Sequence, residues 1–187
     1  MFERFTKDAR DVVRGAVTHC EGSGARVVGV EHLLLALLER EASRGAFALA
    51  ALGADRWRES VREELAAARR RAGLSRAEAD ALAGLGIDVT EIVSRVEEAH
   101  GVGALSGDVK DRERWGGRRS FSREAKGALE RSLRIALDRR ERHIGDEHIL
   151  LAVTVLPGVP AEVLADHGVT FETVTRVLYG GGELRAG

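Results

Sequence analysis

An internal repeat constrains this chain more than any other feature. When residues 5–38 are laid on residues 121–154 without a gap, nine of the 34 positions are identical. The clearest stretch is GVEHLLLA, which begins at Gly29 and returns as GDEHILLA from Gly145. Repeats of this length are single supersecondary units that bury their apolar faces by packing together. We therefore expect two related units with an insert between them.

The fold class is expected to be all-α. The chain has only two prolines, and no sustained alternation of apolar and polar residues marks a strand. After Thr6, apolar residues recur at three- and four-residue steps as far as Cys20, and a matching stripe follows Ser122. Each repeat is therefore predicted to hold four helices, and the two four-helix repeats are expected to form a pseudo-twofold pair.

The predicted helix starts repeat as well. Thr6 and Ser122 are suitable N-caps for the first helix of each unit. The second helix is predicted to start at each Gly-x-Glu-His, where Asp146 is a good N-cap and the equivalent Val30 is not. Two further helices are predicted in each unit: a short third one at about 45–52 and 159–166, and a fourth that starts near residues 55 and 170.

The domain division follows from the repeat. Residues 1–72 form the first repeat, 73–120 an insert, and 121–187 the second repeat with a short C-terminal tail. Within the insert, LGID at residues 85–88 echoes LGAD at residues 52–55, and a helical apolar stripe follows it. We expect one or two helices over 75–99, and an exposed glycine- and arginine-rich linker over 100–120.

Composition limits the function classes. The formal net charge is −1, so no overall field favours nucleic acid or an anionic membrane. No long apolar run and no signal peptide is seen, and the cytoplasm is the expected compartment. Cys20 is the single cysteine, so no intrachain disulfide can form, and we interpret it as a small core residue.

The sequence carries no recognised catalytic motif. It contains no P-loop, no Gly-x-Ser-x-Gly, no His-Glu-x-x-His and no Cys-x-x-Cys. We therefore expect a protein that is not an enzyme and that needs no cofactor and no metal. Two alternatives remain open at this point. One is a metal-dependent enzyme that uses the cluster His143, Asp146, Glu147 and His148. The other is nucleic-acid binding through the basic patch at 112–119, which holds Arg112, Arg114, Trp115, Arg118 and Arg119.

The repeated glutamates Glu31 and Glu147 are the most informative candidate site. A carboxylate in a first helical turn can be no more than a partner of the helix dipole. It can also receive a guanidinium group in bidentate fashion. Thr6 and Ser122 lie at helix N-termini, which can receive an anion. A cation receptor beside an anion receptor suits a zwitterionic ligand. The repeated histidines, His32 and His148, are interpreted as half-buried, hydrogen-bonded residues at the helix starts.

The opening segment, MFERFTKDAR, resembles the N-terminal domain of ClpC-type unfoldases. The two Gly-x-Glu-His-hydrophobic-Leu-Leu segments and the FSREAK start of the second repeat resemble it too. This resemblance to the Clp N-terminal family implies an all-α double repeat that binds substrates and adaptors for an ATPase ring. The ATPase modules are not seen in this sequence, so we expect a free-standing copy of the recognition domain.

The resemblance also implies site residues. Some members recognise phosphorylated arginine, and the matching positions are Glu31 and Glu147 for the guanidinium and Thr6 and Ser122 near the phosphate. Because Val30 replaces a small polar residue of the family motif, we expect the first of these sites to be the weaker one. The family's inter-repeat groove is a target of cyclic-peptide antibiotics. The matching groove positions here are Phe2, Arg10, Phe121, Lys126, Leu129 and Glu130.

The sequence thus predicts a non-catalytic binding protein of the Clp protease system. Its expected partners are unfoldase and protease components, adaptors, tagged client proteins or cyclic peptides, and neither nucleic acid nor membrane. It would act either as an adaptor that delivers clients or as a decoy that sequesters peptide antibiotics.

Overall fold

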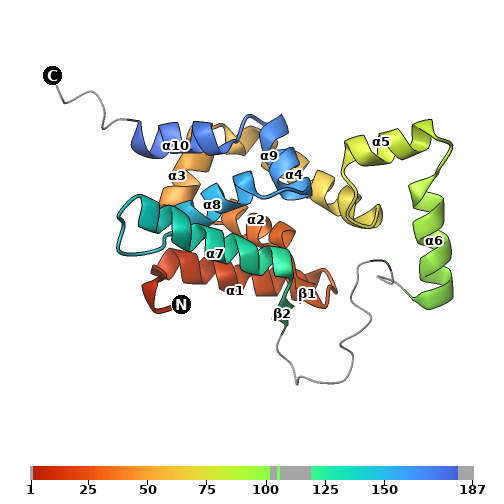
Figure 1. Ribbon diagram of the computed structural model, residues 1–187, viewed down its shortest axis with the longest axis horizontal. Coiled ribbons are helices and arrows are strands. Elements are labelled where there is room, and N and C mark those ends of the chain that lie inside the picture. The colour runs from red at the N-terminus through yellow and green to blue at the C-terminus, as the bar shows by residue number, and fades with distance from the viewer. Residues whose placement is uncertain (1, 102–104, 106–118, 181–187) are drawn as a thin grey trace.

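The computed structural model describes residues 2–101, 105 and 119–180, without the side chain of Phe2 (Figure 1). The predicted all-α class is confirmed. The elements run η1 (Phe2–Arg4), α1 (Lys7–Gly22), β1 (Val27–Val28), α2 (Val30–Leu38), α3 (Arg44–Ala51), α4 (Ala54–Arg70), α5 (Arg76–Gly84), α6 (Val89–His100), β2 (Ser120–Phe121), α7 (Arg123–Asp138), α8 (Asp146–Val155), α9 (Val159–Asp166) and α10 (Phe171–Tyr179).

The predicted helix order is also confirmed. The helices α1 to α4 correspond to α7 to α10, and α5 and α6 occupy the insert where further helices were expected. Residues 112–118 of the basic patch at 112–119, and most of the expected linker, lie outside the described residues. The domain division at residues 72 and 120 stays a prediction. Within the described residues, no single helix has the length and apolar composition needed to cross a bilayer. The helices α8 and α9 pass that test only as a pair bent by 96°.

The core forms around α2 and α8, whose leucine-rich sequences are buried on nearly every side. The long amphipathic helices α1 and α7 cover them, each packing most extensively on the central helix of its own repeat. The short helices cross over: α3 packs on α8 and α10, and α9 packs on α4 and α2 as well as on α8. The two repeats are therefore interlocked and share one core. Cys20 is buried in that core, as predicted.

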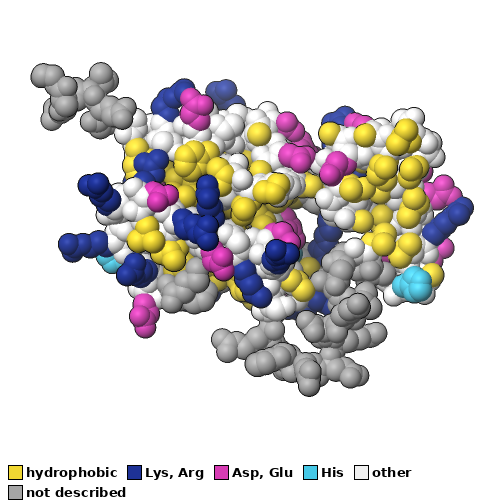
Figure 2. All heavy atoms as spheres, in the orientation of Figure 1, with side chains coloured by type: hydrophobic (Ala, Val, Ile, Leu, Met, Phe, Trp, Pro, Cys, Tyr) yellow, Lys and Arg dark blue, Asp and Glu magenta, His cyan; other side chains and the backbone are white. Residues whose placement is uncertain are grey.

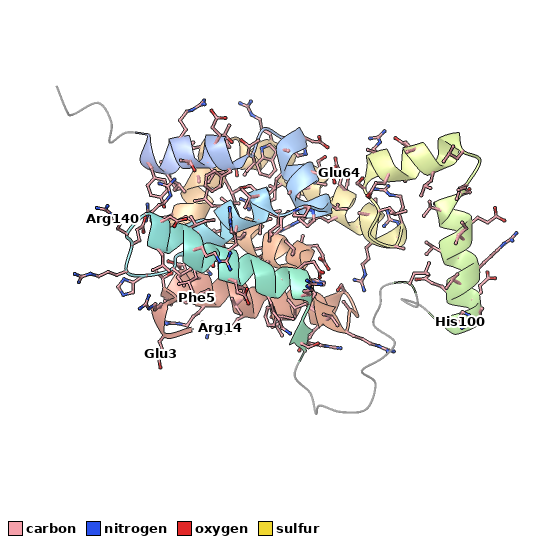
Figure 3. All side chains as sticks on the ribbon, in the orientation of Figure 1. Glu3, Phe5, Arg14, Glu64, His100 and Arg140 are labelled. Carbon is pink, nitrogen blue, oxygen red and sulfur yellow. The ribbon has the colours of Figure 1, made fainter. Side chains whose placement is uncertain are left out.

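Two equivalent backbone pairings join the repeats crosswise. Strand β1 pairs in parallel with β2, so that Val28 lies opposite Phe121. The equivalent residues in the other half, Ile144 and Phe5, form a parallel bridge. Phe5, labelled in Figure 3, is buried at this junction. Each pairing places the start of the first helix of one repeat against the start of the central helix of the other.

The starts of the central helices differ from the sequence prediction. Thr6 and Ser122 do cap α1 and α7, accepting hydrogen bonds from the N–H groups of Ala9 and Ala125. The N-caps of α2 and α8, however, are Gly29 and Gly145, so the prediction of Asp146 as an N-cap was wrong. A glycine suffices there because a histidine in the first turn accepts the cap's own backbone N–H through Nδ1, at 2.9 and 3.0 Å.

Those two histidines, His32 and His148, are hydrogen-bonded at the helix starts, as expected, but are fully buried and not half-buried. Burial, with Arg69 nearby, lowers the pKa of His32 to about 4. Burial also lowers the pKa of His148. Both rings are neutral at physiological pH, and the proton is on Nε2 because Nδ1 accepts the backbone N–H. They are structural caps of the helices.

Asp146 has a different role, which is to link the repeats. Its buried carboxylate accepts hydrogen bonds from the hydroxyl of Ser43 at 2.5 Å and from the N–H of Gly45 at 3.2 Å. Both donors belong to the start of α3, in the other repeat. A Cβ at position 45 would overlap Oδ2 of Asp146, so only glycine allows this approach.

This link gives a stability prediction. The Asp146→Ala variant leaves the N–H of Gly45 buried without an acceptor, and we expect it to lower the free energy of unfolding by about 2 kcal/mol. Urea denaturation followed by circular dichroism measures the change. The matched control is Asp138→Ala, an exposed aspartate at the end of α7, with an expected change within about 0.5 kcal/mol. Equal stability of the two variants would contradict the link.

Candidate functional site

The crossed pairings make each predicted receptor a composite of both repeats. The N–H of Ser122 donates to the carbonyl of Val28, just before the helix that carries Glu31. In the same way, the N–H of Thr6 donates to the carbonyl of Ile144, just before the helix that carries Glu147. The structure therefore places the start of α7 beside the helix that carries Glu31, and the start of α1 beside the helix that carries Glu147. Each site takes its acid from one repeat and its helix N-terminus from the other.

The Glu31 side opens into a cavity of about 510 Å³, which we call the junction cavity. Glu31 and Ser122 both line it. Its walls come from the start of α2, the end of α4, the start of α7 and the turn between α8 and α9, and include Val30, Leu65, Leu156, Pro157 and Val159. The cavity thus joins a carboxylate and a hydroxyl to an apolar wall.

Arg69 also lines the junction cavity, from the last turn of α4. The sequence reasoning missed this residue, because nothing in the sequence marks the end of α4 as a neighbour of the start of α2. Arg69 adds a cation to a cavity that also holds the carboxylates of Glu31 and Glu124. The junction cavity can therefore contact both ends of a zwitterion.

Glu31 itself is accessible at this cavity, with 41% of its side chain exposed. Its carboxylate folds back over Gly29, where a Cβ would overlap it. Oε1 of Glu31 lies 3.2 Å from Nδ1 of His32. That nitrogen accepts the N–H of Gly29 and the ring is neutral, so the contact is not an ion pair.

Glu147 is in the opposite situation, because only 4% of its side chain is exposed. The guanidinium of Arg44, at the start of α3, donates to it at 2.8 Å and reaches Glu141 at 3.2 Å. The same guanidinium lies over the ring of Tyr179, 5.3 Å from its centroid. This carboxylate thus already binds a guanidinium, as the sequence predicted for a carboxylate in a first helical turn. The guanidinium, however, belongs to the chain itself.

The difference between the two acids follows from the sequences of the short helices. The helix α3 begins at Arg44 after Ser43, whereas its counterpart α9 begins at Val159 after Gly158. Val159 cannot pair with Glu31, and it lines the junction cavity instead. The expectation that the first site is the weaker one rested on Val30, but the accessible carboxylate in the structure is Glu31.

Burial raises the pKa of Glu147 to about 7, and the carboxyl group of Asp146 adds to the effect, while the backbone and Arg44 act against it. Between about pH 4.5 and 7 the folded protein therefore holds this proton and the unfolded chain does not. Raising the pH through this range favours the unfolded state.

This pKa gives a prediction for the Glu147→Gln variant, which cannot ionise. Relative to that variant, the stability of the wild type should fall by on the order of 2 kcal/mol between pH 5 and pH 8. Denaturation at both pH values measures it. Subtracting the stability of the variant from that of the wild type removes the contribution of His32. That contribution has the opposite pH dependence, because the pKa of His32 is lowered in the folded state. A stability difference that is constant with pH would show that the carboxyl group ionises normally.

The alternative metal cluster is not assembled as predicted. His143 is exposed, and Asp146 is bonded to the start of α3. The groups that lie within 4.8 Å of one another are Glu141, Glu147 and His148. The guanidinium of Arg44 already pairs with both of these glutamates, and Nε2 of His148 carries the ring proton. An internal cation thus already pairs with both acids, and the geometry does not favour a metal.

The predicted peptide-groove residues lie on α1 and α7 or in the segments just before these helices. Arg10 is exposed and donates to the carbonyl of Phe5 at 2.8 Å. Lys126 and Glu130 are exposed, Phe121 is partly buried, and Leu129 is buried in the core. The side chain of Phe2 lies outside the described residues. None of the five described groove residues lines the junction cavity, so the groove stays a prediction.

Comparison with known proteins gives a family match for the first part of the chain. Residues 4–80 match the family model of the Clp repeat (R) N-terminal domain. Over these residues the chain is similar to the Clp N-terminal domain family. The fold extends over both repeats: the N-terminal domain of the chaperone ClpD from Arabidopsis thaliana superposes with a TM-score of 0.53 at 21% identity, covering 97% of this chain and 96% of that one.

The N-terminal domain of Hsp104 from Candida albicans gives a TM-score of 0.52 at 15% identity, covering 97% of this chain and 93% of that one. These likenesses carry the fold alone, while the family match supports a general role in binding substrates or adaptors in the Clp system.

Proposed function

We propose that this chain is a non-catalytic binding module of the Clp protease system, and that its junction cavity binds a guanidinium-bearing side chain of a client or adaptor. One observation carries the proposal: Glu31, Arg69 and Ser122, from three separate helix ends, line the same cavity. Phosphoarginine is the side chain whose charges match these three groups.

The chemistry of the match can be followed group by group. The carboxylate of Glu31 accepts two parallel N–H bonds from a guanidinium. Ser122 already accepts the N–H of Ala125, and its hydroxyl proton remains to donate to a phosphate oxygen at the start of α7. Arg69 adds an opposite charge for the phosphate, and the apolar wall beside Val159 suits the methylene stem of an arginine.

The two receptors are expected to act unequally. A ligand at Glu147 must first displace Arg44 from a buried carboxylate, which breaks an existing ion pair. A ligand at Glu31 meets a half-exposed carboxylate. We therefore expect a single strong site in each chain, in place of the two equivalent sites that the repeated glutamates suggested.

Delivery of tagged clients to an unfoldase and sequestration of cyclic peptides both begin with binding to this module. In the first role the junction cavity holds the tag. In the second role the groove residues of α1 and α7 hold the peptide. The two roles therefore use different surfaces, and substitutions at Glu31 and at Lys126 separate them.

Calorimetric titration with free phosphoarginine tests the proposal. The wild type should bind one equivalent, and Glu31→Ala should weaken binding at least tenfold, as expected when a charged hydrogen-bond pair is lost. Arg69→Ala should weaken the binding of phosphoarginine but not that of plain arginine. The matched control is Glu59→Ala, an exposed glutamate of α4 outside the cavity lining, with unchanged affinity expected.

Two results would contradict the proposal. One is the absence of binding at millimolar phosphoarginine. The other is that Glu31→Ala leaves the affinity for phosphoarginine unchanged while Glu147→Gln abolishes binding. That result would place the site at the buried carboxylate.

A further inference from the structure

The helices α5 and α6 form an arm that extends from the rest of the molecule (Figure 1). We define the α5–α6 arm as residues 75–101. Its two helices pack chiefly against each other. No residue of α5 is buried, and in α6 only Val93 is. Figure 2 shows hydrophobic side chains gathered over the surface of this lobe.

The arm repeats the local structure of α9 and α10. Gly86 and Gly168 both adopt a left-handed backbone conformation, with φ of 79° and 75°. In both turns the next residue donates back to the carbonyl of a leucine, from Ile87 to Leu82 at 3.0 Å and from Val169 to Leu164 at 2.9 Å. A side-chain cap follows in each, from Asp88 and Thr170. The arm is therefore a further copy of the short helix pair that each repeat uses.

The equivalent apolar positions differ in burial. In α9 and α10, Val169 and Val174 are fully buried. Their counterparts in the arm, Ile87 and Ile92, are 38% and 46% exposed, and Leu85 in the same turn is 77% exposed. The arm thus has the apolar pattern of a helix pair that packs in a core, but its apolar side chains are exposed.

Helices cover this pattern elsewhere in the chain. The helix α9 packs against α2, α4 and α8, and its counterpart α3 packs against α8 and α10. The helices of the arm have 9 and 12 residues, and isolated helices of that length are marginal in water. A further helix laid on Leu85, Ile87 and Ile92 would supply the missing layer.

The charge of the arm decides which helix fits. The arm carries six acidic residues, at positions 78, 80, 88, 91, 97 and 98. The arm has two arginines, and both pair within their own helix: Arg76 with Asp80 at 4.0 Å, and Arg95 with Glu91 at 2.5 Å. Two arms of two copies in contact would set like charges against each other, which disfavours a second copy.

We propose that the α5–α6 arm is a docking site for a basic amphipathic helix of a partner protein, separate from the junction cavity. The apolar face of that helix covers Leu85, Ile87 and Ile92. Its Lys or Arg residues face the acidic residues of the arm. This is helix-in-groove recognition, in which burial of the apolar face supplies affinity and the acidic residues supply selectivity.

The test uses a labelled 14-residue peptide of leucine and lysine in helical spacing, followed by fluorescence anisotropy at 0.15 M salt with the full chain. We expect the wild type to bind the peptide. The double variant Leu85→Ser/Ile92→Ser should bind it at least tenfold more weakly, and the affinity of Glu91→Lys/Glu98→Lys should fall by a similar factor. The matched control is Phe47→Ser, which removes a side chain that is 63% exposed on α3, with unchanged affinity expected.

Circular dichroism of each variant checks that the core remains folded, and hydrogen exchange should show the peptide protecting residues 76–100 in the wild type. Three outcomes would overturn the proposal. They are equal binding of a leucine–glutamate peptide, equal loss in Phe47→Ser, and a light-scattering mass of two chains that Leu85→Ser/Ile92→Ser reduces to one. The third outcome would assign the arm to a second copy. None of them bears on phosphoarginine binding at Glu31.

Discussion

The crossed backbone pairing of the two repeats is the constraint on which the other features depend. Phe5 pairs with Ile144 and Phe121 with Val28, so the first helix of each unit starts beside the central helix of the other. The same exchange lets α3 and α9 pack across the repeat boundary. Neither repeat therefore supplies a complete candidate site, and Glu31 and Ser122 line one cavity only because the two units are interlocked.

The pseudo-symmetry holds for the backbone and fails for the electrostatics. At the start of α8, Asp146 accepts hydrogen bonds from Ser43 and Gly45. These bonds hold the start of α3 where Arg44 can pair with Glu147. At the start of α2 the residue equivalent to Asp146 is Val30, and the helix that approaches it begins with Val159. One glutamate has thereby become part of an internal charge network, while the other faces a cavity.

The sequence was sufficient to predict the repeat, the order of the helices and the caps at Thr6 and Ser122. These features depend on local periodicity and on single residues with strong backbone preferences. It was insufficient to distinguish Glu31 from Glu147, because that difference comes from Arg44, which lies 103 positions from its partner. The misplaced cap at Asp146 has a similar cause. An aspartate at a helix start looks like a cap, but here a glycine and a histidine side chain perform that function.

The crossed pairing also bears on how such a chain tolerates change. The insert connects α4 to β2, and both of these elements contact the core that the two repeats share. Closing a flexible loop becomes harder only with the logarithm of its length, and each doubling costs about 0.6 kcal/mol. The length of this segment can therefore vary at a small cost in stability, whereas loss of either repeat would remove both crossed pairings at once.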